Sequence, residues 1–221
     1  MSEQGADQTM TTIAILGTGN VARALAGTLH DAGNEVIVGS RAPQRTATDW
    51  AGYGVRVTDL PHAAGSAELV INATPGHASV EVLTGLAAEL TDKVLVDIAN
   101  ATEFDSDGFA SALLYPGSSL AEEIQRALPL VHVVKSLNTM HESVMADPAK
   151  LAVPPSAFLS GNDAGAKKTV GGLLAELGWS PEWITDLGGV ETARGPEAFV
   201  LMVGGLVRAL GPVPFGMAIA R

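Results

Sequence analysis

The chain has 221 residues, a formal net charge of −11 at pH 7 and no cysteine. This length is enough for one full hydrophobic core and a small appendage. The acidic balance argues against nucleic acid and anionic membrane surfaces as partners, because basic patches drive both kinds of binding. The lack of cysteine excludes disulfides, thiolate catalysis and cysteine-based metal sites, and it fits a cytoplasmic protein. Residues 1–10 are polar and lack the features of a signal peptide, so we expect a disordered tail there.

The most informative stretch is a glycine turn near the beginning of the chain. An apolar run over 13–16 leads into Gly17-x-Gly19-x-x-Ala22, a helical pattern follows, and a second apolar run covers 36–38. This order of strand, turn, helix and strand is typical of dinucleotide-binding folds. Gly17 allows the tight turn, Gly19 lets backbone N–H groups approach a pyrophosphate, and Ala22 lets helix and strand pack closely. The alternative is a tight turn that binds no nucleotide.

The end of the second strand indicates which nucleotide binds. NAD sites usually place Asp or Glu there to bind the ribose hydroxyls. This chain has Gly39-Ser40-Arg41 and then Arg45, with no carboxylate between Glu35 and Asp49. A hydroxyl and guanidinium groups match a 2′-phosphate, so we expect NADP rather than NAD. The alternative is that both arginines are solvated residues at the start of the next helix.

Short apolar runs alternate with helical patterns along the next hundred residues. Helices are predicted over 43–50, 60–64, from the 74–77 turn to about 90, and over 119–127; strands are predicted over 55–58, 69–73, 93–98 and 132–136, with an irregular stretch over 99–117. Six strands separated by helices predict an α/β fold with a Rossmann-type doubly wound parallel sheet. Ligands of such sheets bind at the carboxyl ends of the strands. The loops at Gly17, Ser40, Thr74, Ala99 and Leu137 are therefore expected to line one crevice.

The chain changes character near residue 149. Strands are predicted over 156–160, 183–185 and 215–220, and helices over 163–177 and 191–210. We therefore divide the chain into a disordered tail (1–10), an NADP-binding Rossmann domain (11–148) and a small C-terminal α+β domain for the acceptor and for dimerisation (149–221). The 191–210 helix is apolar nearly all round, which is typical of a buried helix, although its most apolar window, 198–210, is too short to span a bilayer. Burial in a homodimer is the preferred interpretation, and a core helix within its own domain is the alternative.

Few residues of the predicted crevice carry acid–base chemistry. His77 follows the turn after the fourth strand, where it either lies beside the nicotinamide or caps the first turn of its helix. Asn138 and His141 follow the sixth strand, and no histidine pair stands at metal-ligand spacing with a carboxylate, so no metal is predicted. Lys135-x-x-Asn138 resembles the catalytic pair of the 3-hydroxyacid dehydrogenases. The alternative for Lys135 is a strand-end cation near cofactor or substrate.

Hydride transfer needs no acid or base from the protein when both reactants are redox cofactors. The protein then has to hold the two rings at the right distance and orientation. A crevice with backbone amides, small residues and no obvious catalytic group fits this reaction. We expect Gly188, Gly189 and the segment 192–195 to form its far wall.

Several segments together resemble the NADP oxidoreductases that use the deazaflavin coenzyme F420. They are the glycine turn with the second strand (17–41), ATPGH at 73–77, DIAN at 97–100, VVKSLNTM at 133–140, SGND at 160–163 and DLGGVETARGPE at 186–197. The resemblance covers residues 11–221 in order. It implies a Rossmann domain, a small C-terminal domain, a dimer, and direct hydride exchange between NADPH and the deazaflavin.

The resemblance also implies binding roles for individual residues. In one of them this chain differs from the archaeal members, because Asn138 stands where they have a histidine near the deazaflavin. The loop over 101–117 resembles a bacterial subgroup. The expected cofactor contacts are Gly17, Thr18, Gly19, Asn20, Val21, Ser40, Arg41, Arg45, Ala73, Thr74, Pro75, His77 and Ala99. The expected acceptor contacts are Asn138, Met140, Gly188, Gly189 and Arg194, and the candidates for catalysis are His77, Lys135 and Asn138.

Other functions stay open at the level of the sequence. The related pyrroline-carboxylate reductases act on a C=N bond, but they add a larger helical domain than the segment after 149 provides. Related domains also occur in ferric reductases, with a flavin as acceptor. A third alternative is an NADPH-binding sensor or partner protein without catalytic activity.

Overall fold

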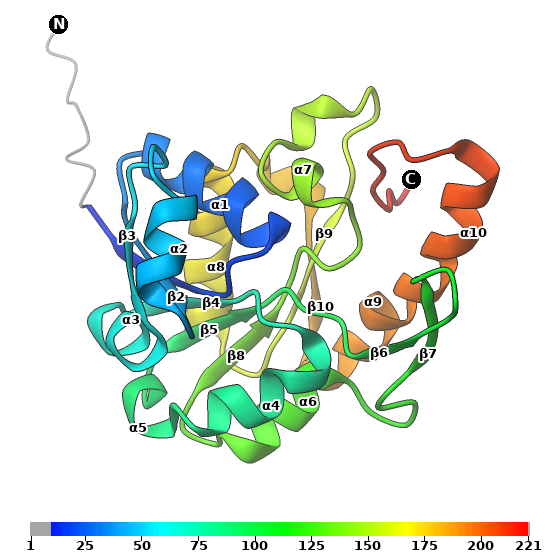
Figure 1. Ribbon diagram of the computed structural model, residues 1–221. Helices are drawn as coiled ribbons and strands as arrows, with labels where there is room; N and C mark the ends of the chain where they lie inside the picture. Colours follow the sequence, from blue (N-terminus) through cyan, green and yellow to red (C-terminus); the bar gives the residue numbers. More distant parts are fainter. Residues whose placement is uncertain (1–9, 221) are drawn as a thin grey trace, which may run out of the picture.

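Eight strands form one sheet through the centre of the protein, with helices on both of its faces (Figure 1). The computed structural model describes residues 10–220, so the tail predicted over 1–10 lies, apart from Met10, outside the described residues. The strand order across the sheet is β10-β9-β8-β5-β4-β1-β2-β3. The strands are β1 (Thr12–Leu16), β2 (Glu35–Ser40), β3 (Arg56–Asp59), β4 (Leu69–Asn72), β5 (Val94–Asp97), β8 (His132–Lys135), β9 (Ala157–Ser160) and β10 (Ile184–Gly188).

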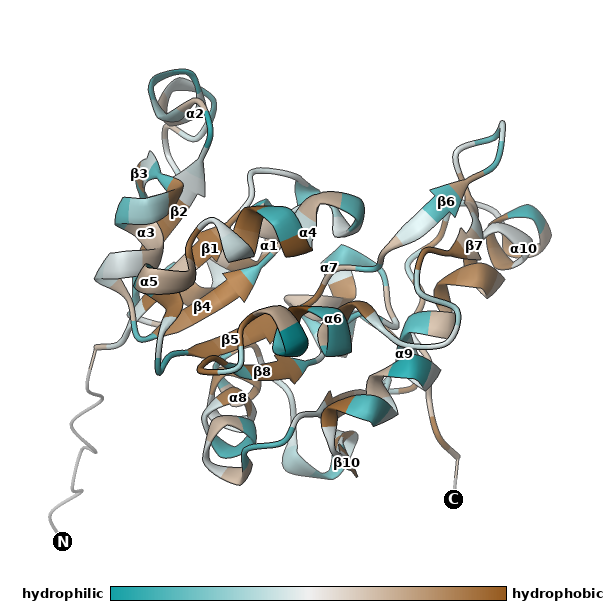
Figure 2. Ribbon diagram, turned by 90° about the horizontal axis from the view of Figure 1, so that it is seen from below, coloured by the Kyte–Doolittle hydropathy of each residue, from teal (hydrophilic) through white to brown (hydrophobic). Residues whose placement is uncertain are grey.

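Side chains alternate between the two faces of each strand, and both faces of the central strands are buried, whereas the edge strands β3 and β10 are partly exposed. In β1, Ile13 and Ile15 belong to one hydrophobic core, whereas Ala14 and Leu16 belong to the other. Figure 2 shows the apolar strands running between the two helical layers. The first core is covered by α1 (Asn20–Asp31), α7 (Glu142–Met145) and α8 (Ala164–Glu176), and the second by α3 (Leu60–Ser66), α4 (Gly76–Thr84), α5 (Ala87–Leu90) and α6 (Leu120–Ala127). The remaining helix of the first half, α2 (Pro43–Asp49), packs on the edge strand β3.

This arrangement confirms the predicted fold class. The strands β1, β2, β3, β4, β5 and β8 run parallel to one another. Because β1 lies between β2 and β4, the strand order reverses beside it, and a crevice opens there at the carboxyl ends of the strands. Two details differ from the prediction: the helix expected up to residue 90 is divided into α4 and α5, and the stretch expected to be irregular contains a hairpin of β6 (Thr102–Phe104) and β7 (Ala110–Leu113).

The two strands of the C-terminal segment extend this same sheet. β9 pairs with β8 in the antiparallel direction through Lys135 and Ser160, and β10 pairs with β9 in the parallel direction. Both strands therefore run opposite to the other six. Because Ser160 pairs with Lys135 and Gly188 pairs with Ser160, the last residues of β9 and β10 lie level with the carboxyl end of β8.

The helix predicted over 191–210 is divided into shorter pieces, and a single chain does not bury all of it. The segment forms a short 3-10 helix (Val190–Ala193), then α9 (Arg194–Ala198) and α10 (Val200–Leu210). In α10, Gly204 is buried against Phe109 of the β6–β7 hairpin, but Leu201 and Met202 are 41% and 57% exposed. Other helices already cover both faces of the sheet, so α10 packs beside the hairpin at the rim of the molecule (Figure 1).

The prediction of a final strand over 215–220 is wrong. A single bridge joins Met140 to Gly216. The N–H of Met217 donates to the carbonyl of Thr139, and the carbonyl of Met217 accepts from the N–H of Ser156. The segment thus crosses from one partner to another instead of running along one strand. Within residues 10–220, no helix has the length and apolar character needed to cross a membrane.

Candidate functional site

The main cleft of the protein opens at the carboxyl ends of β1, β2 and β4. Its volume is about 630 Å³. It is lined by the glycine turn, by the turn after β2 with the adjoining face of α2, and by the first turn of α4. Ten of the expected cofactor contacts line it: Gly17, Thr18, Gly19, Ser40, Arg41, Arg45, Ala73, Thr74, Pro75 and His77.

The glycine turn has the geometry that a bound phosphate requires. Gly17 has a φ of +129°, and a Cβ at this position would lie 2.3 Å from the carbonyl oxygen of Ala73. Any other residue would therefore separate the turn from the end of β4. Gly19 is the N-cap residue of α1, where no side chain caps the described helix, so the N–H groups of its first turn remain available to an anion. Asn20 begins this helix and lines neither cleft.

Two guanidinium groups stand at the other end of the main cleft. Arg41 and Arg45 are exposed, and within residues 10–220 neither makes a hydrogen bond or an ion pair. The hydroxyl of Ser40 instead holds the turn together: it accepts from the N–H of Ala42 at 3.0 Å and lies 2.7 Å from the hydroxyl of Thr46. Two free cations beside an ordered turn match a phosphate group.

The cleft contains a third cation that the sequence reasoning missed. Arg23, in the first turn of α1, lies 4.9 Å from the ring centre of Trp50 and donates to the carbonyl of Asp49. Trp50 also lines the cleft, and its buried Nε1–H has no acceptor in the described part of the chain. The position of Arg23 only six residues after Gly17 is the signal that points to it.

A smaller cleft of about 220 Å³ continues from the main one and shares Ala73 and Thr74 with it. The amides of Asn100 and Asn138 meet in the lining of this cleft, where Asn138 Nδ2 donates to Asn100 Oδ1 at 3.0 Å. Its lining residues, all within the described range, include no titratable side chain: they are Val21, Ala73, Thr74, Gly76, Ile98, Ala99, Asn100, Asn138, Met140 and Met145. The expected cofactor contacts Val21 and Ala99 and the expected acceptor contacts Asn138 and Met140 thus meet here.

Lys135 lies behind the small cleft and not in it. Its ammonium group is buried between the carboxylates of Asp97 and Glu197, each at 2.9 Å. Burial alone would lower the pKa of Lys135, but the two carboxylates outweigh it and raise that pKa above the ordinary lysine value. The lysine therefore stays charged at the end of β8, where its partners are protein carboxylates. Asp97 and Glu197 themselves were missed, because their separation in the sequence hides that they meet.

The two candidate histidines of the predicted crevice lie in different places. His77 is exposed in the main cleft. His141 caps α7, where its Nδ1 accepts from the N–H of Ser143. Among residues 10–220, no cluster of His, Asp or Glu is arranged to hold a metal ion.

Three expected acceptor contacts line neither cleft. Gly188 ends β10 and Gly189 follows it. Gly188 lies level with the carboxyl end of β8, but β10 is the outermost strand of the sheet, two strands beyond β8 on the side away from β1. Arg194 forms an ion pair with Glu122 on the surface of α6, with N···O distances of 2.8 and 2.6 Å. The sequence identifies these segments without giving the direction of the strand that carries them.

Comparisons with known proteins agree with this geometry. Residues 12–101 match the family model described as NADP oxidoreductase coenzyme F420-dependent. A crystal structure from Arthrobacter sp. FB24, of a protein proposed to be an F420-dependent NADP reductase, is 41% identical, with a TM-score of 0.89 over 96% of this chain and 100% of that one. The metalloreductase STEAP3 of Rattus norvegicus is 32% identical over 190 residues, which are 86% of this chain but only 36% of that protein.

A likeness to more distant enzymes concerns the fold alone. An imine reductase from Streptomyces aurantiacus is 20% identical, with a TM-score of 0.62 over 90% of this chain and 62% of that one. The match to the Arthrobacter protein is much stronger, because it covers nearly the whole of both chains and its sequence identity is twice as high. On that match and on the family model at the glycine turn, the chain belongs to the coenzyme F420-dependent NADP oxidoreductase family and is an NADP-dependent oxidoreductase.

Proposed function

We propose that this oxidoreductase transfers a hydride between NADP(H) and a deazaflavin, coenzyme F420, or a similarly flat redox acceptor. The observation that carries the proposal is the small cleft: it adjoins the main cleft and is lined by small, apolar and amide side chains without a titratable group. When NADPH is bound, its nicotinamide supplies the hydride. The protein supplies the clefts that hold the two reactants together.

The chemistry of the lining separates the classes of acceptor. Reduction of an isolated carbonyl or imine needs a proton at the oxygen or nitrogen as the hydride arrives at carbon, and an acid beside the substrate usually provides it. A conjugated ring accepts the hydride at one atom and can take its proton from water at another. A site without an acid suits the second class. In the small cleft, the amides of Asn100 and Asn138 can bind polar edges of such a ring but cannot act as acids.

The main cleft supports NADPH as the other reactant. Its glycine turn can take the pyrophosphate, and Arg41 and Arg45 can take the 2′-phosphate. The adjoining small cleft then receives the nicotinamide end, because the two clefts share Ala73 and Thr74. The Arthrobacter relative, proposed to use F420, supports the deazaflavin as the acceptor to test first.

A direct assay tests the proposal. The protein is mixed with NADPH and deazaflavin, and the absorbance of each is followed; flavins and cyclic imines replace the deazaflavin in parallel reactions. We expect rapid loss of both bands with the deazaflavin and little turnover with the imines. Turnover of the imines alone would make the protein a reductase of C=N bonds, and NADPH binding without turnover of any acceptor would favour a sensor.

A matched pair of variants ties the activity to the small cleft. Ala99→Leu places a larger side chain in the lining of this cleft, and Ala87→Leu makes the same change at an exposed position of α5. We expect Ala99→Leu to abolish hydride transfer while NADPH still binds through the main cleft. Ala87→Leu should behave as the unmodified protein, and equal activity of the two variants would contradict the assignment.

A further inference from the structure

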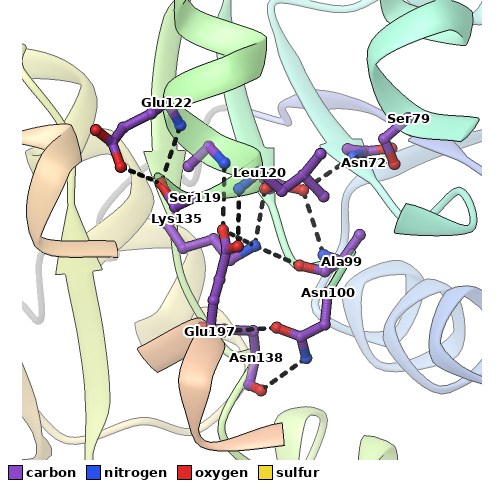
Figure 3. A network of polar contacts seen from close by, with 12 residues as sticks. Asn72, Ser79, Ala99, Asn100, Ser119, Leu120, Glu122, Lys135, Asn138 and Glu197 are labelled. Atoms are coloured by element: carbon purple, nitrogen blue, oxygen red, sulfur yellow. Dashed lines mark hydrogen bonds and ion pairs between the residues drawn. The ribbon is translucent and has the colours of Figure 1, made fainter. Parts of the chain in front are cut away.

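A buried ion cluster connects the C-terminal helices to the wall of the small cleft. Lys135, Asp97 and Glu197 are 1%, 0% and 3% exposed. Their two carboxylates and one ammonium leave one negative charge in excess. Glu197 places that charge at the N-terminus of α6, where it accepts from the N–H groups of Leu120 at 2.7 Å and Ala121 at 3.2 Å. The first turn of a helix stabilises such a charge, and Figure 3 shows these contacts.

The contacts of Lys135 account for all of its ammonium hydrogens. One donates to Asp97, one to Glu197 and the third to the carbonyl of Ala99. A proton donor to substrate needs a hydrogen that points into the site. Lys135 therefore acts on its protein neighbours and not on the reactants.

Hydrogen bonds hold both backbone polar groups of Ala99. Its carbonyl accepts from Lys135, and its N–H donates to the second oxygen of Asp97 at 3.2 Å. Asp97 is held in turn by Asn72 at 2.8 Å. Ala99 and Asn100 form one wall of the small cleft, so the position of this wall depends on the cluster.

Glu197 brings a distant part of the chain into this arrangement. It stands in α9, which contacts α6 through Glu197 and Arg194 and leads directly into α10. When α9 is docked, Lys135 has two carboxylates around it and a defined direction toward Ala99. Without Glu197 the ammonium group loses one of its three partners, and the carbonyl of Ala99 loses a rigidly held donor.

We propose that Lys135 is a positioning residue of the hydride-transfer site, which holds the Ala99–Asn100 wall of the small cleft in place, and that Glu197 makes this wall depend on the docking of α9. The inference rests on the proposed function, since the wall matters to the reaction only when the nicotinamide lies in the small cleft. Its test therefore includes a measurement that needs no acceptor.

The first test compares Glu197→Gln with Glu123→Gln. Both changes remove one negative charge near the first turn of α6, but Glu123 pairs with Arg126 of the same helix, so Glu123→Gln leaves the contacts of α9 with α6 in place. The fluorescence anisotropy of bound NADPH reports the mobility of its nicotinamide, and single-turnover absorbance reports hydride transfer. For Glu197→Gln we expect retained NADPH affinity, lower anisotropy and a hydride-transfer rate reduced about 10- to 100-fold, the usual consequence of a misplaced reactant. Glu123→Gln should match the unmodified protein.

A second variant separates positioning from folding. Lys135→Met combined with Asp97→Asn and Glu197→Gln removes all three buried charges together and keeps amide oxygens for the N–H groups of Ala99, Leu120 and Ala121. We expect this triple variant to bind NADPH and to show the same loss of anisotropy and of rate, with both partly recovered in Lys135→Arg. Anisotropy and rate equal to those of Glu123→Gln, in Glu197→Gln or in the folded triple variant, would overturn the inference.

The outcome can be distinguished from a failure of the proposed function. If the unmodified protein reduces no deazaflavin or flavin, the proposed function fails, but the anisotropy of NADPH in these variants still measures whether the cluster orders the nicotinamide. If hydride transfer is observed and the anisotropy does not change, the proposed function stands and the positioning role fails.

Discussion

Arg41 and Arg45 present free guanidinium groups at the end of the main cleft, and no acidic residue follows β2 directly. NADPH should therefore bind at least tenfold more tightly than NADH. Loss of one charge-assisted contact to a phosphate costs about 1.5–3 kcal/mol, so Arg41→Ala should weaken NADPH by roughly ten- to a hundredfold and leave NADH nearly unchanged. Titration of both cofactors by fluorescence measures this.

The control for Arg41 is an exposed arginine outside the cleft. Arg56 on β3 pairs loosely with Glu35 at 3.5 Å, and Arg56→Ala changes the net charge of the protein by the same amount. We expect it to leave both affinities unchanged, since salt screens exposed charges at a distance. Equal losses for NADPH and NADH in Arg41→Ala would remove the 2′-phosphate assignment.

The raised pKa of Lys135 also leads to a prediction about pH dependence. A group whose pKa is raised in the folded state contributes its full stabilisation at pH values below its ordinary pKa, which is 10.5 for lysine. The stabilisation is lost only as the pH rises through the higher pKa of the folded state. A lysine that donates a proton to substrate has a lowered pKa instead. We therefore expect the hydride-transfer rate to show no lysine ionisation between about pH 7 and 10. A transition in this range that moves in Lys135→Arg would identify Lys135 as a catalytic acid.

At the scale of secondary-structure elements, the sequence predicts the first half of the chain well. The glycine turn, the alternation of strands and helices and the short apolar runs together define one topology, because parallel strands need crossover helices. The C-terminal half has no such constraint. A strand such as β10 carries the same apolar pattern in either direction, so the direction of its carboxyl end, and with it the place of Gly188 and Gly189, became known only from the structure.

Close packing between elements is a second feature that the sequence did not predict. The first turn of α4 touches the loop after β5 so closely that a Cβ at Gly76 would lie 2.1 Å from the carbonyl oxygen of Asn100. Gly76→Ala should therefore push this loop away from α4, lower stability by about 1–3 kcal/mol, as overpacking usually does, and impair hydride transfer. Thermal unfolding and the absorbance assay measure the two effects.

A glycine in α3 provides the matched control. A Cβ at Gly65 would have its nearest neighbour at 3.8 Å, an ordinary contact with Glu89. Because alanine favours a helix over glycine by about 0.5–1 kcal/mol, Gly65→Ala should be neutral or stabilising. If Gly76→Ala is as stable and active as Gly65→Ala, the contact between α4 and the Asn100 loop does not shape the small cleft.

At the scale of the whole molecule, α10 is the element whose apolar side chains a single chain does not cover. The apolar pattern of this helix predicts burial, yet Leu201, Met202 and Leu210 are 41%, 57% and 63% exposed, and Val213 and Ile219 of the following segment are exposed as well. Sequence patterning indicates that a surface is buried but not whether the same chain or another one covers it. Apolar groups gathered in this way are uncommon on monomeric proteins and typical of contact surfaces.

We expect a second copy of the chain to cover α10 in a twofold symmetric dimer. Light scattering should then give a mass of two chains of 22.6 kDa. Met202→Glu places a charge at the centre of the exposed α10 surface, where it would lie buried and unpaired in the dimer, so it should shift the protein toward monomer. Leu130→Glu makes the same change at a residue that is 63% exposed before β8, and it should leave the mass of the dimer intact.

A monomeric mass for the unmodified protein, or an equal effect of both substitutions, would show that α10 is not the contact surface between two copies. Because α10 follows α9 directly, the dimer and the small cleft can also be tested together: a monomeric Met202→Glu with normal NADPH anisotropy would show that Glu197 docks without the second copy.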